Sequence, residues 1–232
     1  MPFEEPRKMN PCIVPCAPQD GEDGRWLSQH NQHLTETKGR EPDVVMIGDS
    51  IIHHLQLRPV WSDMFEQFHC LNFGISGDKT QNVLWRIQHG ELDNITPKAV
   101  VIHVGTNNID DTAQDVVDGI MEVAFSVRTR LPEAYLIILE LLPRGQYPNK
   151  LREKNKQVNQ LLRQKVQGLP RIEALSVENG LVQSDGTISH LDMPDYLHLS
   201  DLAYRKAFEP LHDLLSQILY EDEKEKELSF SE

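Results

Sequence analysis

Apolar runs and amphipathic stretches alternate along the middle of the chain. Five short runs rich in β-branched and aliphatic residues have the length and character of buried strands, at 44–47, 70–73, 99–104, 135–142 and 172–177. The stretches between them carry the apolar period of amphipathic helices, most clearly at 81–90, 113–131, 149–166 and 202–219. Strands that alternate with helices form βαβ units, so the pattern predicts an α/β fold: a three-layer sandwich with a parallel five-stranded sheet and helices on both faces.

The two ends of the chain lack this alternation. Residues 1–24 are broken by prolines and have no apolar period, and residues 221–232 carry six acids against two lysines. We therefore expect a flexible N-terminal tail over 1–24, one globular domain over 25–220 and a flexible acidic tail over 221–232. Within the domain, residues 178–199 show neither period, and an irregular loop of this length in a compact domain is usually functional.

Composition narrows the class of protein. A length of 232 residues suits a single domain, and a net charge of −13 argues against binding nucleic acid through its phosphates. The longest apolar run, 134–139, has six residues, too few to span a bilayer, and the acidic, proline-broken start does not resemble a secretory signal. We expect a cytoplasmic protein without a transmembrane segment, whose Cys12, Cys16 and Cys70 are reduced thiols.

Three polar, glycine-bearing turns follow the first three predicted strands. Ser50 follows the first strand, Gly77 lies in the turn after the second, and Asn107 follows the third. Ligands of an open parallel sheet bind beyond the carboxyl ends of the strands, near the point where strand order reverses. The sequence therefore predicts that these three residues meet at one edge.

A hydrolytic serine needs a base, a carboxylate that orients the base, and donors for the developing oxyanion. Asp195 and His198 are three residues apart, so in a helical turn they would project from one side, and they end the long loop. We expect Ser50 to begin a helix, where its N–H points outward, and Gly77 to let the backbone approach a substrate. With the side-chain amide of Asn107, these groups would form an oxyanion hole.

The set Gly48-Asp49-Ser50, Gly77, Gly105-x-Asn107 and Asp195-x-x-His198 resembles the four blocks of the GDSL, or SGNH, hydrolases. Longer stretches, at 71–75, 83–86, 104–108, 141–145, 151–155 and 184–190, resemble the catalytic α subunits of intracellular type I platelet-activating factor acetylhydrolase, and the likeness runs from about residue 23 to 219. The resemblance implies a flavodoxin-like fold and a calcium-independent esterase without a cofactor. The implied substrates are platelet-activating factor-like phospholipids carrying an sn-2 acetyl group, or small esters. It also implies a homodimer, or a heterodimer with a related subunit, and a dynein-linked WD40 partner of the lissencephaly type.

The same resemblance assigns roles to residues. Ser50 matches the nucleophile, Asp195 and His198 complete the triad, and Ser50, Gly77 and Asn107 form the oxyanion hole. Ile51, Thr106 and Leu197 fall where the family lines a short acyl pocket, and no residue is implied as a metal ligand.

Departures from the family pattern surround these matches. Where close relatives have Gly-Gly-Asp before a small residue, this chain reads Ser76-Gly77-Asp78-Lys79, and His103 replaces a tryptophan. Ser76 adds a Cβ to a turn in which the relatives have glycine, and Lys79 and His103 change the charge near the edge. The substrate is therefore less constrained than the reaction class.

Other interpretations remain open. The chain could be an inactive α-type subunit retained for dimerisation and propeller binding. A phosphate- or flavin-binding domain of the same fold is disfavoured, since G-x-x-x-x-G-K-[ST] is missing. His190 with Asp192 could suggest a metal, but the ligand spacing of a zinc site is lacking. The remaining aromatic and histidine residues are read as packing or surface residues: His53, His54, His69, His89, His212, Trp26, Trp61 and Trp85.

Overall fold

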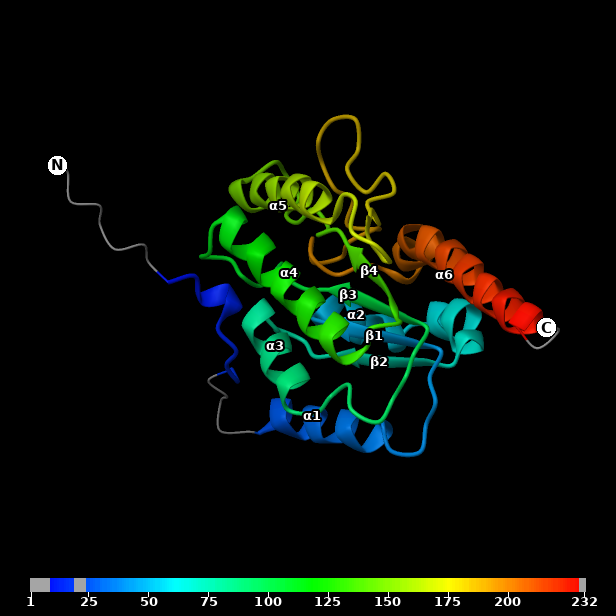
Figure 1. Cartoon of the computed structure of the whole chain (residues 1–232). Helices are drawn as coiled ribbons and strands as arrows, with labels where there is room; N and C mark the ends of the chain where they lie inside the picture. The colour runs from blue at the N-terminus through cyan, green and yellow to red at the C-terminus, as the bar shows by residue number, and fades with distance from the viewer. Residues whose placement is uncertain (1–8, 19–23, 230–232) are drawn as a thin grey trace.

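The computed structural model describes residues 9–18 and 24–229, and its centre is one parallel sheet. The strands are β1 (Val44–Gly48), β2 (Cys70–Gly74), β3 (Ala99–His103), β4 (Tyr135–Leu139) and β5 (Ile172–Leu175), in the order β2-β1-β3-β4-β5 (Figure 1). All four pairings are parallel. The predicted five-stranded parallel sheet is confirmed, and its order reverses between β1 and β3, next to the strand that precedes Ser50.

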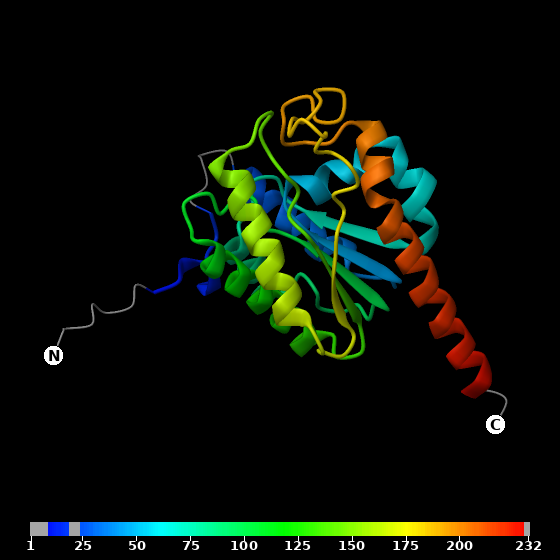
Figure 2. The ribbon, with the colours of Figure 1, turned by 90° about the horizontal axis from the view of Figure 1, so that it is seen from above.

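Helices cover both faces of the sheet, which confirms the three-layer sandwich. One face carries α3 (Thr80–Gln88), α4 (Ala113–Arg130) and α5 (Lys150–Val166), and the other carries α2 (Ser50–Gln56) and α6 (Asp201–Ser229). Figure 2 shows the sheet between α5 and α6. Side chains alternate along each strand, so Val45 and Ile47 enter the first core and Val44 and Met46 the second. The remaining long helix, α1 (Arg25–Glu36), packs beside α3 through contact of Trp26 with Trp85.

The fourth strand is shorter than the sequence pattern predicts. It ends at Leu139 rather than at residue 142, because side-chain amides of α5 take over the backbone bonds. Asn159 accepts a hydrogen bond from Leu141 N (2.8 Å) and donates one to Leu141 O (2.9 Å), and Asn155 donates to Leu142 O (2.9 Å). The predicted strand was three residues too long because it was based on apolar character alone.

Residues 9–18, expected to belong to a flexible tail, lie instead against α3 and α4. Cys12, in the short 3₁₀ helix Pro11–Ile13, is fully buried, and its carbonyl accepts a hydrogen bond from Thr80 Oγ1 (2.9 Å). Cys16 accepts a hydrogen bond from Asn82 Nδ2 (2.9 Å) and donates its N–H to Gln81 O (3.1 Å). Polar groups of α3 thus satisfy backbone groups of a segment whose one regular element is the short 3₁₀ helix. The other parts of the predicted tail, 1–8 and 19–23, lie outside the described residues.

The last helix continues ten residues beyond its predicted end, through most of the segment expected to be an acidic tail. Contacts one turn apart support it, because Gln217 donates to Glu221 (2.9 Å) and Lys224 Nζ lies 4.6 Å from the centre of the Tyr220 ring. Asp222 also forms an ion pair (3.3 Å) with Lys98, the residue that precedes β3. Residues 230–232 lie outside the described part of the chain.

Two other expectations concern the long loop and the cysteine residues. Residues 178–199 contain no helix or strand, only an isolated bridge between Val182 and Ile188, as predicted. The three cysteines are free thiols. Among the helices of residues 9–18 and 24–229, none has both the length and the apolar character needed to cross a bilayer.

Candidate active site

Ser50 lies where β1 ends and α2 begins. Asp49 caps the helix, since its Oδ1 accepts the N–H of Ile51 (2.9 Å), and Ser50 is only 5% exposed. Tyr204 of α6 donates its hydroxyl to Ile51 O (2.8 Å), which ties the first turn of α2 to the far end of the chain. The prediction that Ser50 begins a helix is confirmed, and its hydroxyl is held on a rigid element.

The long loop returns to this position and brings two more of the predicted residues to Ser50. His198 Nε2 lies 2.9 Å from Ser50 Oγ, and His198 Nδ1 lies 2.6 Å from Asp195 Oδ2. Because a carboxylate can only accept, Nδ1 carries the proton and Nε2 can accept the serine proton. Desolvation raises the pKa of Asp195, but hydrogen bonds from His198 and Leu197 outweigh it and hold the pKa at about 2. The geometry is that of a serine, a base and a charged orienting group.

The turn that joins Asp195 to His198 is not the helical turn that their spacing suggested. Tyr196 has a left-handed φ of 58°, and Asp195 Oδ1 accepts the backbone N–H groups of Leu197 (3.1 Å) and His198 (2.7 Å). The carboxylate therefore organises the turn with one oxygen and the imidazole with the other. The expected pairing was right, but the expected backbone was wrong, because side-chain bonding competes with helix formation in such segments.

Gly77 and Asn107 lie on the neighbouring turns of the same edge. The sheet register pairs Gly48 with Gly74 and with His103, so the turns after all three strands start at one level. Gly77 has a φ of 89°, and a Cβ added there would find no atom within 4 Å. Asn107 Nδ2 donates one hydrogen bond to Asp78 O (2.9 Å), the residue after Gly77. The second N–H of this amide and the backbone of Gly77 are groups of the kind that an oxyanion hole uses.

The three residues expected to line an acyl pocket lie in different surroundings. Ile51 is 1% exposed and part of the core beneath α6, and Thr106 is buried, with its carbonyl bonded to Arg144 Nη1 (2.8 Å). Leu197 is half-buried and lines a cavity of about 600 Å³ together with Asp195 and Arg144. Arg144, which fixes the turn before Asn107, was not identified from the sequence, where nothing distinguishes it from a surface arginine.

The residues that depart from the family pattern make specific contacts. Ser76 has no left-handed φ, so its Cβ fits the turn, and its hydroxyl lies 3.1 Å from His53 Nδ1. His103 is fully buried, with Nδ1 3.3 Å from Oδ1 of Asp49, the residue that precedes the nucleophile. Lys79 is half-buried and immediately precedes α3.

His54 touches the predicted base, although the sequence suggested only packing or surface roles for it. Its ring centre lies 4.6 Å from that of His198, at an angle of 45°. The sequence spacing could have predicted this contact, because His54 is four residues after Ser50 and so lies on the same face of α2. Burial lowers the pKa of His54, and the neighbouring His198, His53 and Arg58 lower it further, against a smaller opposing effect of Asp195.

We expect His54→Leu to change the acid side of the pH profile. In the wild type, a proton on His54 places a cation beside the imidazole that must itself become charged in the reaction. A proton on His54 therefore slows the reaction, so log kcat/KM should fall more steeply toward low pH in the wild type than in the variant. Ester hydrolysis measured at constant ionic strength checks this, and equal slopes in the two proteins would contradict it.

The described part of the chain holds no group of three or more His, Cys, Asp or Glu side chains arranged to bind a metal ion. His190 and Asp192, the pair considered from the sequence, therefore belong to no such group there.

Comparisons with known proteins show which family this chain belongs to. A model described as the GDSL-like Lipase/Acylhydrolase family matches residues 46–206. A Drosophila melanogaster protein named platelet-activating factor acetylhydrolase IB subunit beta homolog is 46% identical over 225 residues, 97% of this chain and 100% of that protein. The human IB subunit alpha1 is 49% identical over 92% of this chain and 93% of its own.

Solved structures share the fold at much lower identity. A GDSL-like lipase from Bacteroides thetaiotaomicron has a TM-score of 0.67 and 17% identity, and the match covers 83% of this chain and 98% of that one. An acetyl-xylooligosaccharide esterase from Geobacillus matches with a TM-score of 0.55 and 15% identity, over 74% of this chain and 94% of the other. These two likenesses concern the fold alone.

Proposed function

Because this chain belongs to the GDSL-like lipase/acylhydrolase family, we propose that it removes the sn-2 acetyl group of platelet-activating factor-like ether phospholipids through an acetyl-serine intermediate. Family membership makes it a carboxylic ester hydrolase. The observation that carries the acetyl-serine mechanism is the chain of hydrogen bonds from Ser50 through His198 to Asp195. The names of its relatives support the acetylated phospholipid as substrate.

The proposed mechanism uses the geometry directly. His198 Nε2 takes the proton of Ser50 Oγ as the oxygen attacks the acetyl carbonyl, and Asp195 stabilises the imidazolium through Nδ1. The N–H groups of Ser50 and Gly77 and the amide of Asn107 stabilise the oxyanion. His198 then protonates the leaving alcohol, and it activates a water molecule that hydrolyses the acetyl-serine.

An acetyl preference is testable with the purified protein. We propose that Ile51, Thr106 and Leu197 bound a short acyl pocket, and the two buried members, Ile51 and Thr106, favour a small group. Each extra methylene forced into a packed pocket costs about 1–3 kcal/mol, so a butanoyl analogue should lose at least about 10-fold in kcat/KM. We also propose that hydrolysis does not need calcium. Release of the free acid from matched acetyl and butanoyl lipids measures the acetyl preference, and the same assay with a calcium chelator measures the calcium independence. Equal rates for both lipids would contradict the acetyl preference, and loss of activity on chelation would contradict calcium independence.

We also propose that the protein dimerises and binds a dynein-linked WD40 protein in the cytoplasm. The relatives are named as subunits, which supports an assembly. The alternative is a catalytically weak subunit that acts mainly as a binding partner, and the observation that favours it is the changed residue His103, buried against Asp49 next to the serine. Light scattering and a propeller-binding assay test the assembly, and binding without acetate release would identify the alternative.

A further inference from the structure

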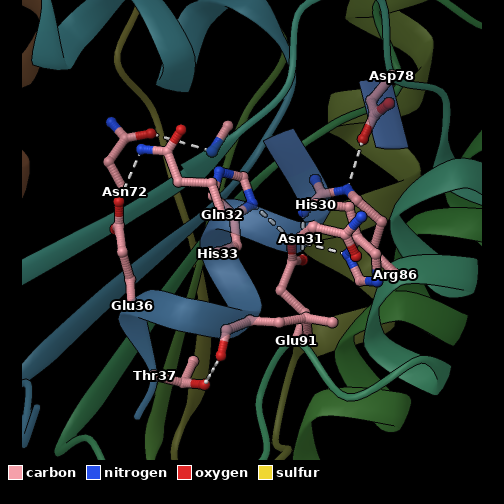
Figure 3. A network of polar contacts seen from close by, with 12 residues as sticks. His30, Asn31, Gln32, His33, Glu36, Thr37, Asn72, Asp78, Arg86 and Glu91 are labelled. Atoms are coloured by element: carbon pink, nitrogen blue, oxygen red, sulfur yellow. Dashed lines mark hydrogen bonds and ion pairs between the residues drawn. The ribbon is translucent and has the colours of Figure 1, made fainter. Parts of the chain in front are cut away.

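A fully buried arginine lies beneath the carboxyl edge of the sheet, and every one of its side-chain nitrogens makes a hydrogen bond. Arg86 of α3 donates from Nε to Asp78 Oδ2 (2.8 Å), from Nη1 to Glu91 Oε2, and from Nη2 to Gly48 O (3.2 Å). Figure 3 shows Arg86 between Asp78 and Glu91, with His33 of α1 on the far side of Glu91. Arg86 is 0% exposed, as is Glu91, and Asp78 is 1% exposed.

Two of the three partners of Arg86, Gly48 and Asp78, lie within two residues of groups proposed as oxyanion donors. Gly48 is two residues before Ser50, and Asp78 directly follows Gly77. The carbonyl of Asp78 accepts the amide of Asn107 (2.9 Å). One guanidinium therefore links the backbone that leads to Ser50, the turn that carries Gly77, and the acceptor that orients Asn107.

Asp78 has a second anchor. Trp26 of α1 donates from Nε1 to Asp78 Oδ1 (2.6 Å), so each carboxylate oxygen has a donor and the turn is held from two elements. Burial raises the pKa of Asp78 to about 6, while Arg86 and Trp26 favour its charged form. The same guanidinium, with His33 donating from Nδ1 (2.7 Å), holds the pKa of Glu91 well below its usual range against the effect of burial.

The cost of this arrangement points to a role beyond stability. Burying charges carries a desolvation penalty, and a well-packed apolar cluster of similar volume is often as stable or more so. What an apolar cluster cannot do is fix polar turns at set positions, which a planar guanidinium with several directed donors can. Donors of an oxyanion hole act only when they are held in place before the charge develops.

We propose that Arg86 is a positioning residue for the oxyanion hole and holds the Ser50, Gly77 and Asn107 donors in one geometry. The inference rests on the proposed esterase function. This role needs no contact between Arg86 and the substrate, because Arg86 is fully buried and acts through the backbone and the turn that it binds. Loss of its directed bonds should therefore lower transition-state stabilisation and leave ground-state binding almost unchanged.

Arg86→Lys and Trp26→Phe test this with p-nitrophenyl acetate as substrate. Lysine keeps the charge but replaces the rigid planar fork with one compact, rotatable ammonium group, and phenylalanine removes only the N–H that anchors Asp78. Misplacing reacting groups by about 1 Å costs on the order of 100-fold, so we expect kcat to fall about 10- to 100-fold in Arg86→Lys and less in Trp26→Phe. KM should stay within about 2-fold of the wild-type value, because the contacts that bind the substrate in its ground state are unchanged.

The affinity for a trifluoromethyl ketone distinguishes a positioning role from a purely structural one, because a purely structural role would not change it. It forms a serine hemiketal whose oxygen occupies the oxyanion hole, so its affinity should fall by the same factor as kcat/KM. Arg128→Lys is the matched control: Arg128 also donates to backbone carbonyls, of Pro132, Ala134 and Arg171, but at the opposite edge of the sheet. It should lower the unfolding temperature without changing kcat or ketone affinity.

Separate outcomes would overturn the inference and the function. Folded Arg86→Lys and Trp26→Phe proteins with wild-type kcat and ketone affinity would overturn the positioning role alone, as would a fall in kcat without a parallel loss of ketone affinity. If Arg86→Lys does not fold, Trp26→Phe decides between the same outcomes. A wild-type protein that hydrolyses no acetyl ester and binds no ketone would overturn the proposed function and this inference with it.

Discussion

Replacement of Ser50 with alanine is expected to abolish ester hydrolysis and labelling by a fluorophosphonate probe. The hydroxyl that His198 Nε2 meets at 2.9 Å is then missing, so no covalent intermediate can form. Loss of the nucleophile from such a unit typically lowers kcat on the order of 10⁶-fold. The removed group is one oxygen at the start of a helix, so the unfolding temperature should change little. Acetate release, gel fluorescence of the labelled protein and a thermal melt measure the three quantities.

Ser62→Ala is the matched control for this experiment. Its hydroxyl donates to the carbonyl of Pro59 at an exposed position of the short helical segment Trp61–Phe65, and it takes no part in the hydrogen-bond chain of the site. This variant should keep both turnover and labelling. Persistent labelling or turnover in Ser50→Ala, with Ser62→Ala unchanged, would place the nucleophile elsewhere.

Asp195→Asn should produce the second largest loss, about 10³- to 10⁴-fold in kcat, by changing the tautomer of the base. The amide of asparagine can donate to His198 Nδ1, which moves the imidazole proton to Nε2, the nitrogen that must accept the serine proton. The wild-type carboxylate has its pKa lowered to about 2, so it loses its charge only as the pH falls toward that value. Titration of Asp195 therefore does not shape the profile near neutral pH, and the defect of the variant should persist from about pH 6 to about pH 9.

Asp192→Asn is the appropriate comparison, because Asp192 lies in the same loop and its backbone carbonyl, not its side chain, bonds to Ser200 (2.8 Å). It should retain wild-type kcat. A loss in Asp195→Asn smaller than about 10-fold would contradict the tautomer argument, since an intact relay depends on the orienting acid. Fluorophosphonate labelling rates provide an independent measure of the same defect.

The sheet and the meeting of its turns were predictable from the sequence for a physical reason. Buried parallel strands are apolar on both faces, so the runs before Ser50, Gly77 and Asn107 were visible, and parallel strands must end at one edge. The pairing of Asp195 with His198 followed from residue types. The left-handed conformation of Tyr196 did not, because a side-chain hydrogen bond decides it and helical spacing says nothing of it.

Tertiary contacts decided what the sequence pattern missed. Residues 9–18 have no apolar period, and they are ordered by bonds to the first turn of α3 that no local rule contains. Arg86 occupies an inward position of α3 among Val83, Leu84 and Ile87, an anomaly visible in the sequence, but its partners come from three separate segments. His54 carried a usable signal in its four-residue spacing from Ser50.

The serine and its base are separated by 148 residues, while the proposed oxyanion donors all lie within the first half of the chain. During synthesis the amino-terminal part emerges first, so the nucleophile and its anion-binding turns can assemble on the ribosome before the residues that activate them exist. A partly made or carboxyl-terminally clipped chain would carry a serine without a base, and would leave esters in its surroundings intact. Hydrolysis by this protein would thus report that its last fifth has docked, which makes turnover a sensitive measure of complete folding.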